Sequence, residues 1–309
     1  MKGMTLRAMT QAVNGIYHGN GEDYDKEITA ITIDSRKVTE GGLFIAIRGE
    51  RSDGHDFIGQ WFEKGAACVI SEKELPDEER SYIQVESSLQ ALKDLALLYR
   101  NNLDVKVVGI TGSVGKTSTK ETISSVLSEK YRVLKTLGNF NNEIGLPLTV
   151  FRLTEDDEVA VLEMGISDFG EMDRLSKIAQ PDICVITNIG FCHLENLGTR
   201  DGILKAKTEI FNHMNPDGIV IVNGDDDKLS TISQVHGKRP LVFGISNKDG
   251  VYADNIKSLG LDGTSFTIHG IKTSDNYSTF DLTVPVPGHH MVYNAMAAAL
   301  VGSVLGLSS

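Results

Sequence analysis

The chain has 309 residues, of which 40% are hydrophobic and 23% charged, enough to form about two folded domains. Its net charge of −12 argues against a nucleic-acid-binding protein, and three scattered cysteines, Cys68, Cys184 and Cys192, argue against a disulfide framework or a zinc site. With no apolar signal core at the N-terminus, and a longest apolar run (295–307) too short to cross a bilayer, we expect a cytoplasmic protein without membrane insertion.

The first hundred residues have the pattern of a small α/β domain. Strand-like runs are predicted at 28–34, 41–49, 66–71 and 81–86, and helices at 56–66 and 88–102. The polar stretch 101–104 is typical of a linker. We therefore predict one domain over residues 1–103 and a second over 104–309.

The second domain alternates longer strands with helices. Strands are predicted at 105–111, 158–165, 182–190 and 218–226, with helices at 116–131, 171–179 and 201–214. Such alternation is typical of a mainly parallel sheet flanked by helices. Shorter runs at 241–245, 264–270 and 278–286 predict an antiparallel extension of this sheet, and an apolar helix at 292–306 closes the chain.

A glycine-rich loop joins the buried strand 105–111 to the helix that follows. Its sequence, TGSVGKT over 111–117, indicates a phosphate-binding loop in the form TGxxGKT rather than the commoner GxxxxGK[ST]. Backbone N–H groups and the helix dipole would face the anion, while Lys116 would reach the β- and γ-phosphates and Thr117 would reach Mg²⁺. The predicted ATP-binding residues of the loop are Gly112, Ser113, Val114, Gly115, Lys116, Thr117 and Ser118.

Polar residues also follow later strands of the same predicted sheet. Glu163 ends one strand and is a candidate Mg²⁺ ligand, and His193 follows another and is a candidate for a second metal or a phosphate. The helix over 201–214 carries Lys205 and Lys207, which their spacing alone would place in solvent.

Several ordered motifs together resemble the Mur ligases, the ATP-dependent enzymes that build the peptide stem of peptidoglycan. These motifs are IDSR at 33–36, GERSDGHDF at 49–57, TGSVGKT, GNFNNEIGLPLT at 138–149, LEMGISDFGE at 162–171, TNIGFCHLENLG at 187–198 and AKTEIF at 206–211. The block at 138–149 resembles one branch, which adds D-alanyl-D-alanine to UDP-N-acetylmuramoyl-tripeptide. The resemblance covers essentially the whole chain.

The resemblance implies roles for individual residues. Lys116, His193 and Lys207 would be catalytic, and the metal ligands would be Thr117, Glu163, His193 and Lys207, the last as a carbamate. Asn294 would contact adenine, although Met291 stands where the family motif has asparagine. The substrate-binding residues would be Ser35, Arg36, Gly54, His55, Asn141 and Asn142.

The activity implied is an ATP- and Mg²⁺-dependent amide ligase that joins D-alanyl-D-alanine to UDP-N-acetylmuramoyl-tripeptide through an acyl phosphate. Family members carry a third, C-terminal domain, which we expect to be absent here, leaving a monomeric chain with weak or no ligation alone. Two alternatives stay open: a related ligase for another amino acid, and a nucleotide-binding module without ligase activity.

Overall fold

The computed structural model describes residues 1–49, 52–76, 80–272 and 277–307, and its chain separates into two compact units. Unit 1 comprises residues 1–104 and 143–155, and unit 2 comprises residues 105–142 and 156–309. The first division falls next to the predicted boundary. Residues 143–155 group with unit 1, although the sequence pattern assigned them to the second domain.

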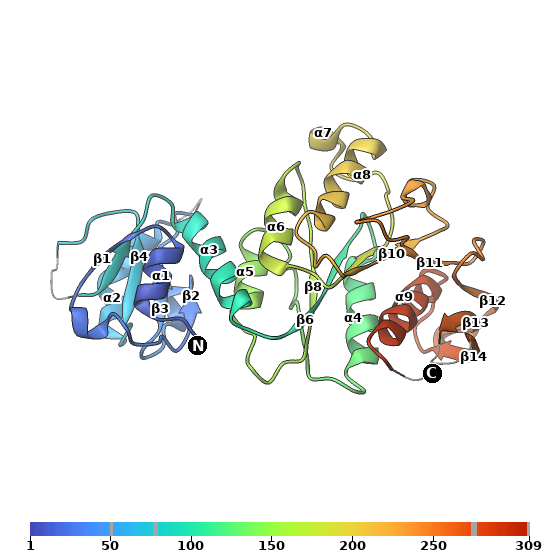
Figure 1. Cartoon of the computed structure of the whole chain (residues 1–309), viewed down its shortest axis with the longest axis horizontal. Helices are drawn as coiled ribbons and strands as arrows, with labels where there is room; N and C mark the ends of the chain where they lie inside the picture. Colours follow the sequence, from blue (N-terminus) through green and yellow to red (C-terminus); the bar gives the residue numbers. More distant parts are fainter. Residues whose placement is uncertain (50–51, 77–79, 273–276, 308–309) are drawn as a thin grey trace. The chain divides into compact units, whose positions relative to one another are not determined.

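Unit 1 is built on a five-stranded sheet of order β1-β5-β4-β3-β2, within the described residues, in which β2 to β5 pair in parallel and β1 is antiparallel to β5. The strands are β1 (Ile16–His18), β2 (Ile31–Thr32), β3 (Leu43–Ile45), β4 (Cys68–Ser71) and β5 (Tyr82–Gln84). The helices are α1 (Leu6–Ala12), α2 (Ile58–Glu63), α3 (Ser88–Asn101) and α5 (Gly145–Val150) (Figure 1).

The helix α3 explains why residues 143–155 belong to unit 1. Ser87 caps its N-terminus by accepting the N–H of Gln90, and its apolar stripe is buried. The Tyr99 hydroxyl donates to the carbonyl of Leu153 at 2.6 Å, and Leu146 and Leu153 are at most 1% exposed. The segment 143–155 therefore completes the apolar layer on α3.

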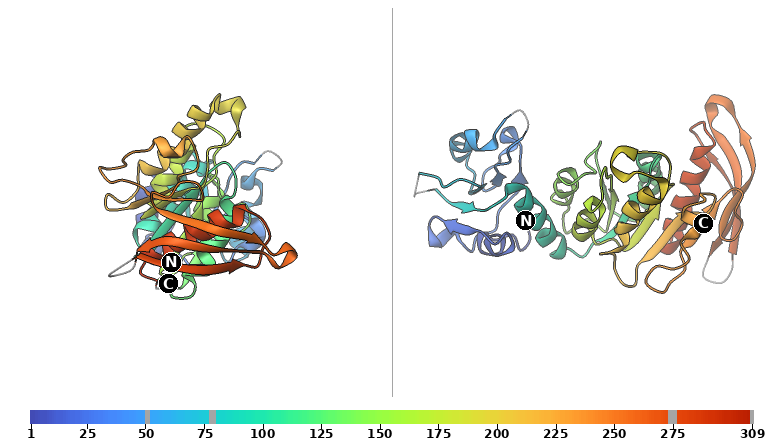
Figure 2. Two further views of the ribbon diagram at one scale, coloured as in Figure 1. Left: turned by 90° about the vertical axis from the view of Figure 1, so that its right-hand side faces the viewer. Right: turned by 90° about the horizontal axis from the view of Figure 1, so that it is seen from above.

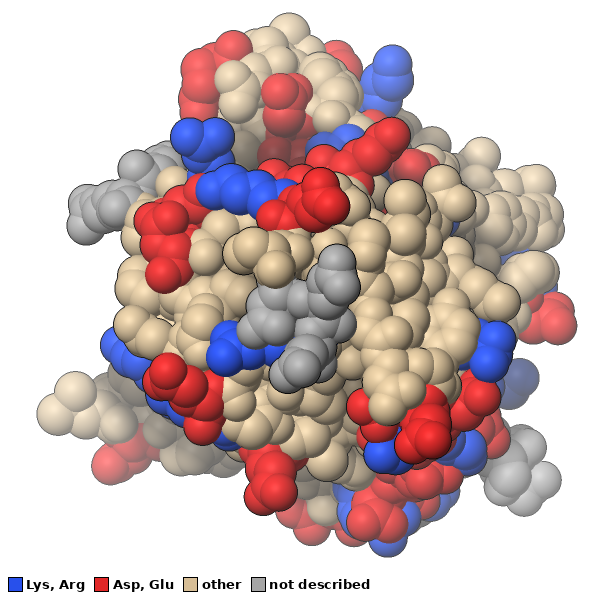
Figure 3. Space-filling model, turned by 90° about the vertical axis from the view of Figure 1, so that its left-hand side faces the viewer, with Lys and Arg blue, Asp and Glu red and all other residues tan. Residues whose placement is uncertain are grey.

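The surface of unit 1 mixes charges of both signs. In the view of Figure 3, acidic and basic side chains adjoin each other around a broad uncharged area. No extended field of one sign covers the described part of this face, so any anionic ligand of unit 1 would have to be recognised by local groups.

Unit 2 is built on a nine-stranded sheet, counted over the described residues, of order β14-β13-β12-β11-β10-β9-β6-β8-β7. Pairing is parallel from β7 to β12 and antiparallel from β12 to β14. The strands are β6 (Lys106–Thr111), β7 (Val133–Lys135), β8 (Val159–Glu163), β9 (Ile183–Ile186), β10 (Ile219–Asn223), β11 (Leu241–Gly244), β12 (Val251–Ser258), β13 (Thr264–Lys272) and β14 (Tyr277–Val284). The mainly parallel α/β fold with an antiparallel extension is thus confirmed.

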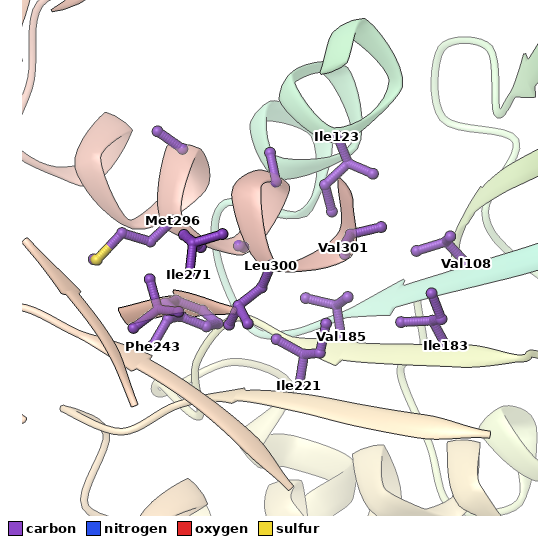
Figure 4. Close-up of a cluster of buried hydrophobic side chains, with 14 of the residues drawn as sticks. Val108, Ile123, Ile183, Val185, Ile221, Phe243, Ile271, Met296, Leu300 and Val301 are labelled. Atoms are coloured by element: carbon purple, nitrogen blue, oxygen red, sulfur yellow. The ribbon is translucent and has the colours of Figure 1, made fainter. Parts of the chain in front are cut away.

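Two helices cover one face of this sheet and enclose the main core. The helices of unit 2 are α4 (Lys116–Leu127), α6 (Glu171–Ala179), α7 (Leu194–Leu197), α8 (Arg200–Thr208) and α9 (His290–Val304). Figure 4 shows Ile123 of α4 and Leu300 and Val301 of α9 above Val185 and Ile221 of the sheet. Because α9 packs against the sheet and also against α4 beside it, it is apolar on nearly all sides, and Figure 2 shows it beside the strands near the C-terminus.

The edge of the sheet differs from the sequence prediction. The run at 241–245 was expected in the antiparallel extension, but β11 pairs in parallel with both β10 and β12. The strand β12 was not predicted, because its alternation is interrupted by polar residues and by a register shift between Asp254 and Lys257. No helix in the described ranges is long and apolar enough to span a bilayer, and the apolar helix predicted at 292–306 is the largely buried α9.

Candidate functional site

The glycine-rich loop follows the central strand β6 and opens α4, as predicted. Gly115 caps α4 with φ +84°, and Gly112 has φ +149°. A Cβ on Gly112 would lie 1.9 Å from Thr187 Oγ1, so only glycine fits there. The Lys116 ammonium donates to the carbonyl of Gly112 at 2.9 Å, which curls the lysine back over the loop.

The residues that follow β9 hold this loop from the other side. Val114 N–H donates to Asn188 Oδ1 at 3.0 Å, and the Val114 carbonyl accepts from Thr187 Oγ1 at 2.7 Å and from Asn188 Nδ2 at 2.9 Å. The Ser113 hydroxyl accepts the N–H of Gly190 at 2.9 Å. Two neighbouring parallel strands therefore fix the loop at the carboxyl edge of the sheet, where ligands of such sheets bind.

Glu163 ends β8 and points at the start of α4. Thr117 Oγ1 lies 3.0 Å and 3.2 Å from the two Glu163 carboxylate oxygens, and Asn141 Nδ2 donates to Oε1 at 2.9 Å. Asn141 is itself fixed, since its carbonyl accepts the N–H of Gly165 at 2.8 Å. The structure therefore brings together three residues that the sequence predicted separately.

The Thr117 and Glu163 oxygens have the chemistry of a magnesium site. A hydroxyl and a carboxylate are hard oxygen ligands, and phosphate oxygens usually complete such a shell. Over the residues that the structure describes, no cluster of three or more His, Cys, Asp or Glu side chains forms a protein-only metal site. These two residues thus fit a metal that arrives with a nucleotide.

Lys207 lies on α8 and is buried, contrary to the solvent-exposed position that its spacing alone favoured. Its side chain is 1% exposed. Burial and the positive charge of Lys116 lower its pKa to about 8, and Cys192 opposes this shift. No hydrogen bond or ion pair to the Lys207 side-chain amine is found within the described ranges. The amine therefore has a larger neutral fraction near pH 7 than an ordinary lysine.

His193 lies in the turn that brings β9 toward α7. It adopts φ +51° and precedes α7, directly after Cys192, whose thiol donates to Ser113 Oγ at 3.2 Å. The chain segment carrying His193 therefore contacts the phosphate loop. Among the described residues, no hydrogen bond or ion pair joins His193 to Glu163 or Lys207, so its metal role stays a prediction.

A cavity of about 350 Å³ adjoins the phosphate loop, within the size range of small-molecule sites. It is lined by Val114, Gly115, Thr119, Thr187, Asn188, Asn223, Asp225, Asp226, Phe243, His290, Tyr293 and Asn294. The lining combines one aromatic wall with amide, hydroxyl and carboxylate groups, which suits a heterocyclic base with a polyhydroxyl group.

Asn294, the predicted adenine contact, lies in this lining but is 6% exposed. Its Oδ1 accepts from Thr119 Oγ1 at 2.9 Å, and its Nδ2 donates to Met291 Sδ at 3.4 Å. Met291 therefore accepts a hydrogen bond from the Asn294 amide within the protein. The adenine role of Asn294 stays a prediction. Both polar atoms of its amide already have a hydrogen-bond partner, which an adenine contact would have to share.

Sequence reasoning missed Asp225, which ties three elements together beside the cavity. Its carboxylate accepts the N–H groups of Ile245 and Asn247, both at 2.6 Å, and the Tyr293 hydroxyl at 2.8 Å. Burial acts to raise the pKa of Asp225, but these hydrogen bonds outweigh it and hold the pKa below its usual value. One feature of the sequence could have identified Asp225: it lies just past the end of β10, at the same edge of the sheet as the ends of the other parallel strands.

In unit 1, Ser35 and Arg36 lie in the turn after β2. Asp34 pairs with the Arg36 guanidinium through two hydrogen bonds of 2.9 Å, which lower the pKa of Asp34 to about 2. Lys64 donates to the Ser35 carbonyl at 3.0 Å. The Arg36 side chain is 86% exposed, and two of its guanidinium nitrogens already donate to Asp34.

Gly54 and His55 lie in the turn between β3 and α2. A Cβ on Gly54 would meet the backbone of Ile47 at 2.8 Å, so glycine is required for this close approach. The His55 side chain is 3% exposed, with Nδ1 2.6 Å from Asp53 Oδ1 and Nε2 accepting the N–H of Glu72 at 3.0 Å. His55 therefore fastens two loops, and its substrate contact stays a prediction.

These two turns share one edge of the unit 1 sheet, because β2 and β3 are parallel neighbours. Glu50 and Arg51 of the motif at 49–57 lie outside the described residues. In unit 2, Asn142 is exposed beside Asn141, and Ser118 lies in the first turn of α4.

Comparison with known families matches most of the chain. The Mur ligase middle domain matches residues 110–302, and the Mur ligase family catalytic domain matches residues 27–100. The chain is 42% identical over 306 residues to the UDP-N-acetylmuramoyl-tripeptide–D-alanyl-D-alanine ligase of Bacillus subtilis, covering 98% of this chain and 64% of that protein. It is 34% identical to the Escherichia coli ligase of the same name, covering 99% of this chain and 66% of that protein. The chain thus spans about two thirds of the length of these relatives.

Solved structures give the same result. A crystal structure of MurF from Acinetobacter baumannii matches with a TM-score of 0.86 and 35% identity, covering 98% of this chain and 65% of that chain. MurF from Thermotoga maritima in complex with ADP matches with a TM-score of 0.80 and 34% identity, covering 90% and 64%. With its sequence motifs, fold and phosphate loop in agreement, the chain belongs to the Mur ligase family.

Proposed function

We propose that this chain provides the nucleotide- and UDP-substrate-binding parts of an ATP-dependent ligase that adds D-alanyl-D-alanine to UDP-N-acetylmuramoyl-tripeptide. The observation that supports this most is the convergence of Lys116, Thr117 and Glu163 with Asn141. Lys116, Thr117 and Glu163 are side chains of the kinds that bind phosphate or Mg²⁺. Asn141 belongs to the motif that resembles this branch of the family. The likeness to ligases of that name, at up to 42% identity, supports the same conclusion.

The nucleotide would bind along the carboxyl edge of the unit 2 sheet. Its phosphates would meet the loop N–H groups, the N-terminus of α4 and the Lys116 ammonium. Its adenosine would occupy the cavity of about 350 Å³ between the loop and α9. Phe243 gives that cavity an apolar wall, and Asp225 gives it a hydrogen-bond acceptor.

Thr117 and Glu163 would hold Mg²⁺, which, when bound, neutralises phosphate charge and so allows two anions to approach each other. His193 and Lys207 would hold a second ion. The Lys207 ammonium does not fit a cation as it stands, but its carbamate would supply a hard oxygen ligand.

The reaction follows from the weakness of a free carboxylate as an acyl donor. The terminal carboxylate oxygen of the tripeptide attacks the γ-phosphorus, the bond from that phosphorus to the bridging oxygen breaks, and ADP leaves. The amine of D-alanyl-D-alanine then attacks the acyl carbon, loses a proton and displaces inorganic phosphate. The part played by Lys116 and the loop N–H groups is to orient the γ-phosphate and offset its charge.

Unit 1 would bind the uridine diphosphate end of the substrate. Arg36 is exposed at the carboxyl edge of a parallel sheet, and guanidinium groups bind diphosphates bidentately. Since both nucleotides are cytoplasmic metabolites, we place the protein in the cytoplasm.

Isothermal titration with ADP, ATP and UDP-N-acetylmuramoyl-tripeptide would test this proposal, followed by assays of phosphate release and product formation. We expect binding of all three ligands, and ATP turnover that depends on the tripeptide substrate. The Bacillus subtilis ligase serves as the positive control. Turnover independent of the tripeptide, or activity with a different amino-acid acceptor only, would contradict the assignment.

A further inference from the structure

Lys120 is a second lysine on α4, one helical turn after Lys116, and none of the functional assignments above uses it. It is 1% exposed and is among the largest fully buried side chains of the described chain. Burying an ammonium group costs much free energy unless partners compensate for it, so its surroundings need an explanation.

The partners of Lys120 lead directly to Glu163. Lys120 Nζ donates to the Thr136 carbonyl at 2.8 Å and lies 3.8 Å from Glu163 Oε2, whose side chain is 3% exposed. The Thr136 hydroxyl in turn accepts the N–H of Glu163 at 3.0 Å. Thr136 therefore holds the backbone of Glu163, while Lys120, itself bonded to Thr136, lies beside the Glu163 carboxylate.

Glu121, the other carboxylate near Lys120, also forms an ion pair with a second lysine, Lys135. Lys120 Nζ is 3.1 Å from Glu121 Oε1, while Lys135 Nζ pairs with Glu121 Oε2. Lys135 and Glu121 are 39% and 49% exposed, so solvent also screens that pair. Lys120 is therefore shared between two carboxylates, but Glu121 also has Lys135, whereas Lys120 is the one cation within 4 Å of Glu163 among the described residues.

We propose that Lys120 is a positioning residue for the nucleotide-associated metal. It holds the Glu163 carboxylate turned toward Thr117, so that the carboxylate is oriented to bind Mg²⁺. The inference rests on the proposed function, because it requires a metal bound with a nucleotide. Lys120 itself contacts neither, so it acts through Glu163.

A purely structural role would have a different signature. If Lys120 only filled space or anchored α4, its loss would disturb the phosphate loop and weaken nucleotide binding equally with and without metal. If it positions Glu163, only the metal-dependent part of nucleotide affinity changes. Mutations of groups that orient metal ligands typically cost about 10- to 100-fold in metal affinity.

The experiment measures ADP affinity of the full 309-residue chain by calorimetry, with excess Mg²⁺ and with EDTA. The ratio of the two dissociation constants is the magnesium enhancement. In Lys120→Gln, which keeps a donor near Thr136 but has no charge, we expect this enhancement to fall about tenfold or more. Affinity in EDTA should stay within about twofold of wild type, since the loop is untouched.

Two further variants keep the test decisive. Lys135→Gln is the matched control, because it removes a lysine from the same cluster without touching Glu163, and it should retain the full enhancement. The second variant combines Lys120→Met with Glu163→Gln. Both charges are then removed, so no buried carboxylate is left without its lysine. We expect Glu163→Gln by itself to abolish the enhancement, so the second substitution should change it no further.

The proposal is overturned if a folded Lys120 variant retains the wild-type enhancement, or if its ADP affinity falls by the same factor with and without Mg²⁺. Additive effects in the double variant would overturn it as well. A wild-type chain that fails to bind ADP at all would instead refute the proposed function, and this inference with it.

Discussion

Lys116 is the residue on which the nucleotide assignment depends most. Its ammonium donates to the Gly112 carbonyl at 2.9 Å, and a nucleotide phosphate would replace that carbonyl as its partner. Charge-assisted hydrogen bonds contribute about 1.5–3 kcal/mol, so Lys116→Ala should weaken ATP binding by at least about tenfold. Calorimetry on the folded variant checks this, and an unchanged dissociation constant would contradict the phosphate-loop assignment.

Lys207 is expected to be essential for ligation because its buried amine would act as a carbamate. Lys207→Ala should abolish the tripeptide-dependent ATP turnover of this chain and product formation in a full-length enzyme, and added short carboxylic acids should restore part of either by replacing the missing oxygen ligand. Lys205→Ala is the matched control, since Lys205 lies exposed on the same helix. A Lys207→Ala enzyme with normal activity would disprove this role.

Residue-level prediction from the sequence succeeded where a motif fixes both the local conformation and the chemistry. The phosphate loop is such a case, because its glycines and lysine can be read directly. The burial of Lys207 could not be read from its spacing, since it depends on how α8 packs against α6 and α7 and on the nearness of Lys116, far away in sequence. The bonding of Asn294 to Thr119 likewise joins residues 175 positions apart. Long-range contacts of this kind leave no local pattern.

At the scale of elements, the connection from β6 to α4 should tolerate no side chain at Gly112. A Cβ there would lie 1.9 Å from Thr187 Oγ1, which holds the Val114 carbonyl. Gly112→Ala should therefore displace the loop, lower the free energy of unfolding by about 1–3 kcal/mol and abolish ATP binding. Thermal denaturation and calorimetry measure the two effects.

Gly115→Ala provides the comparison for that variant. Gly115 also has positive φ, +84°, but no atom lies within 4 Å of its ideal Cβ. Its substitution should cost only the left-handed backbone strain of about 1–2 kcal/mol, without a steric clash. If both variants bind ATP equally well, the close contact with Thr187 is not what requires glycine at position 112.

Long buried strands and helices could be predicted from the sequence, whereas some short elements, among them β7 and α5, were missed. The strands β6, β8, β9 and β10 are continuous apolar runs, as expected when both faces of a parallel sheet are covered. The strand β7 has three residues and α5 has six, too few to show a periodicity. The direction of β11 depends on its two neighbours, which its own four residues do not encode.

At the scale of the whole molecule, the two proposed nucleotide sites lie in different units. Arg36 belongs to unit 1 and the phosphate loop to unit 2. Arg36→Ala should therefore weaken binding of UDP-N-acetylmuramoyl-tripeptide by about tenfold, the loss expected for one charge-assisted contact, and leave ATP affinity nearly unchanged. Calorimetry with each ligand tests this, and equal losses for both would show that the substitution acts through folding.

The two-segment make-up of unit 1 has a consequence for how the protein is made. The chain leaves unit 1 after residue 104 and returns to it at 143–155, so the apolar layer on α3 is complete only when Leu153 has been synthesised. At about 5–20 residues per second, those roughly 50 further residues take about 3–10 s to emerge from the ribosome. During that interval β6, α4 and β7 emerge from the exit tunnel, ahead of the segment that unit 1 still lacks. Unit 1 can therefore complete its core only after the first part of unit 2 has emerged, and a pause in translation before residue 155 would leave α3 exposed to chaperones or proteases.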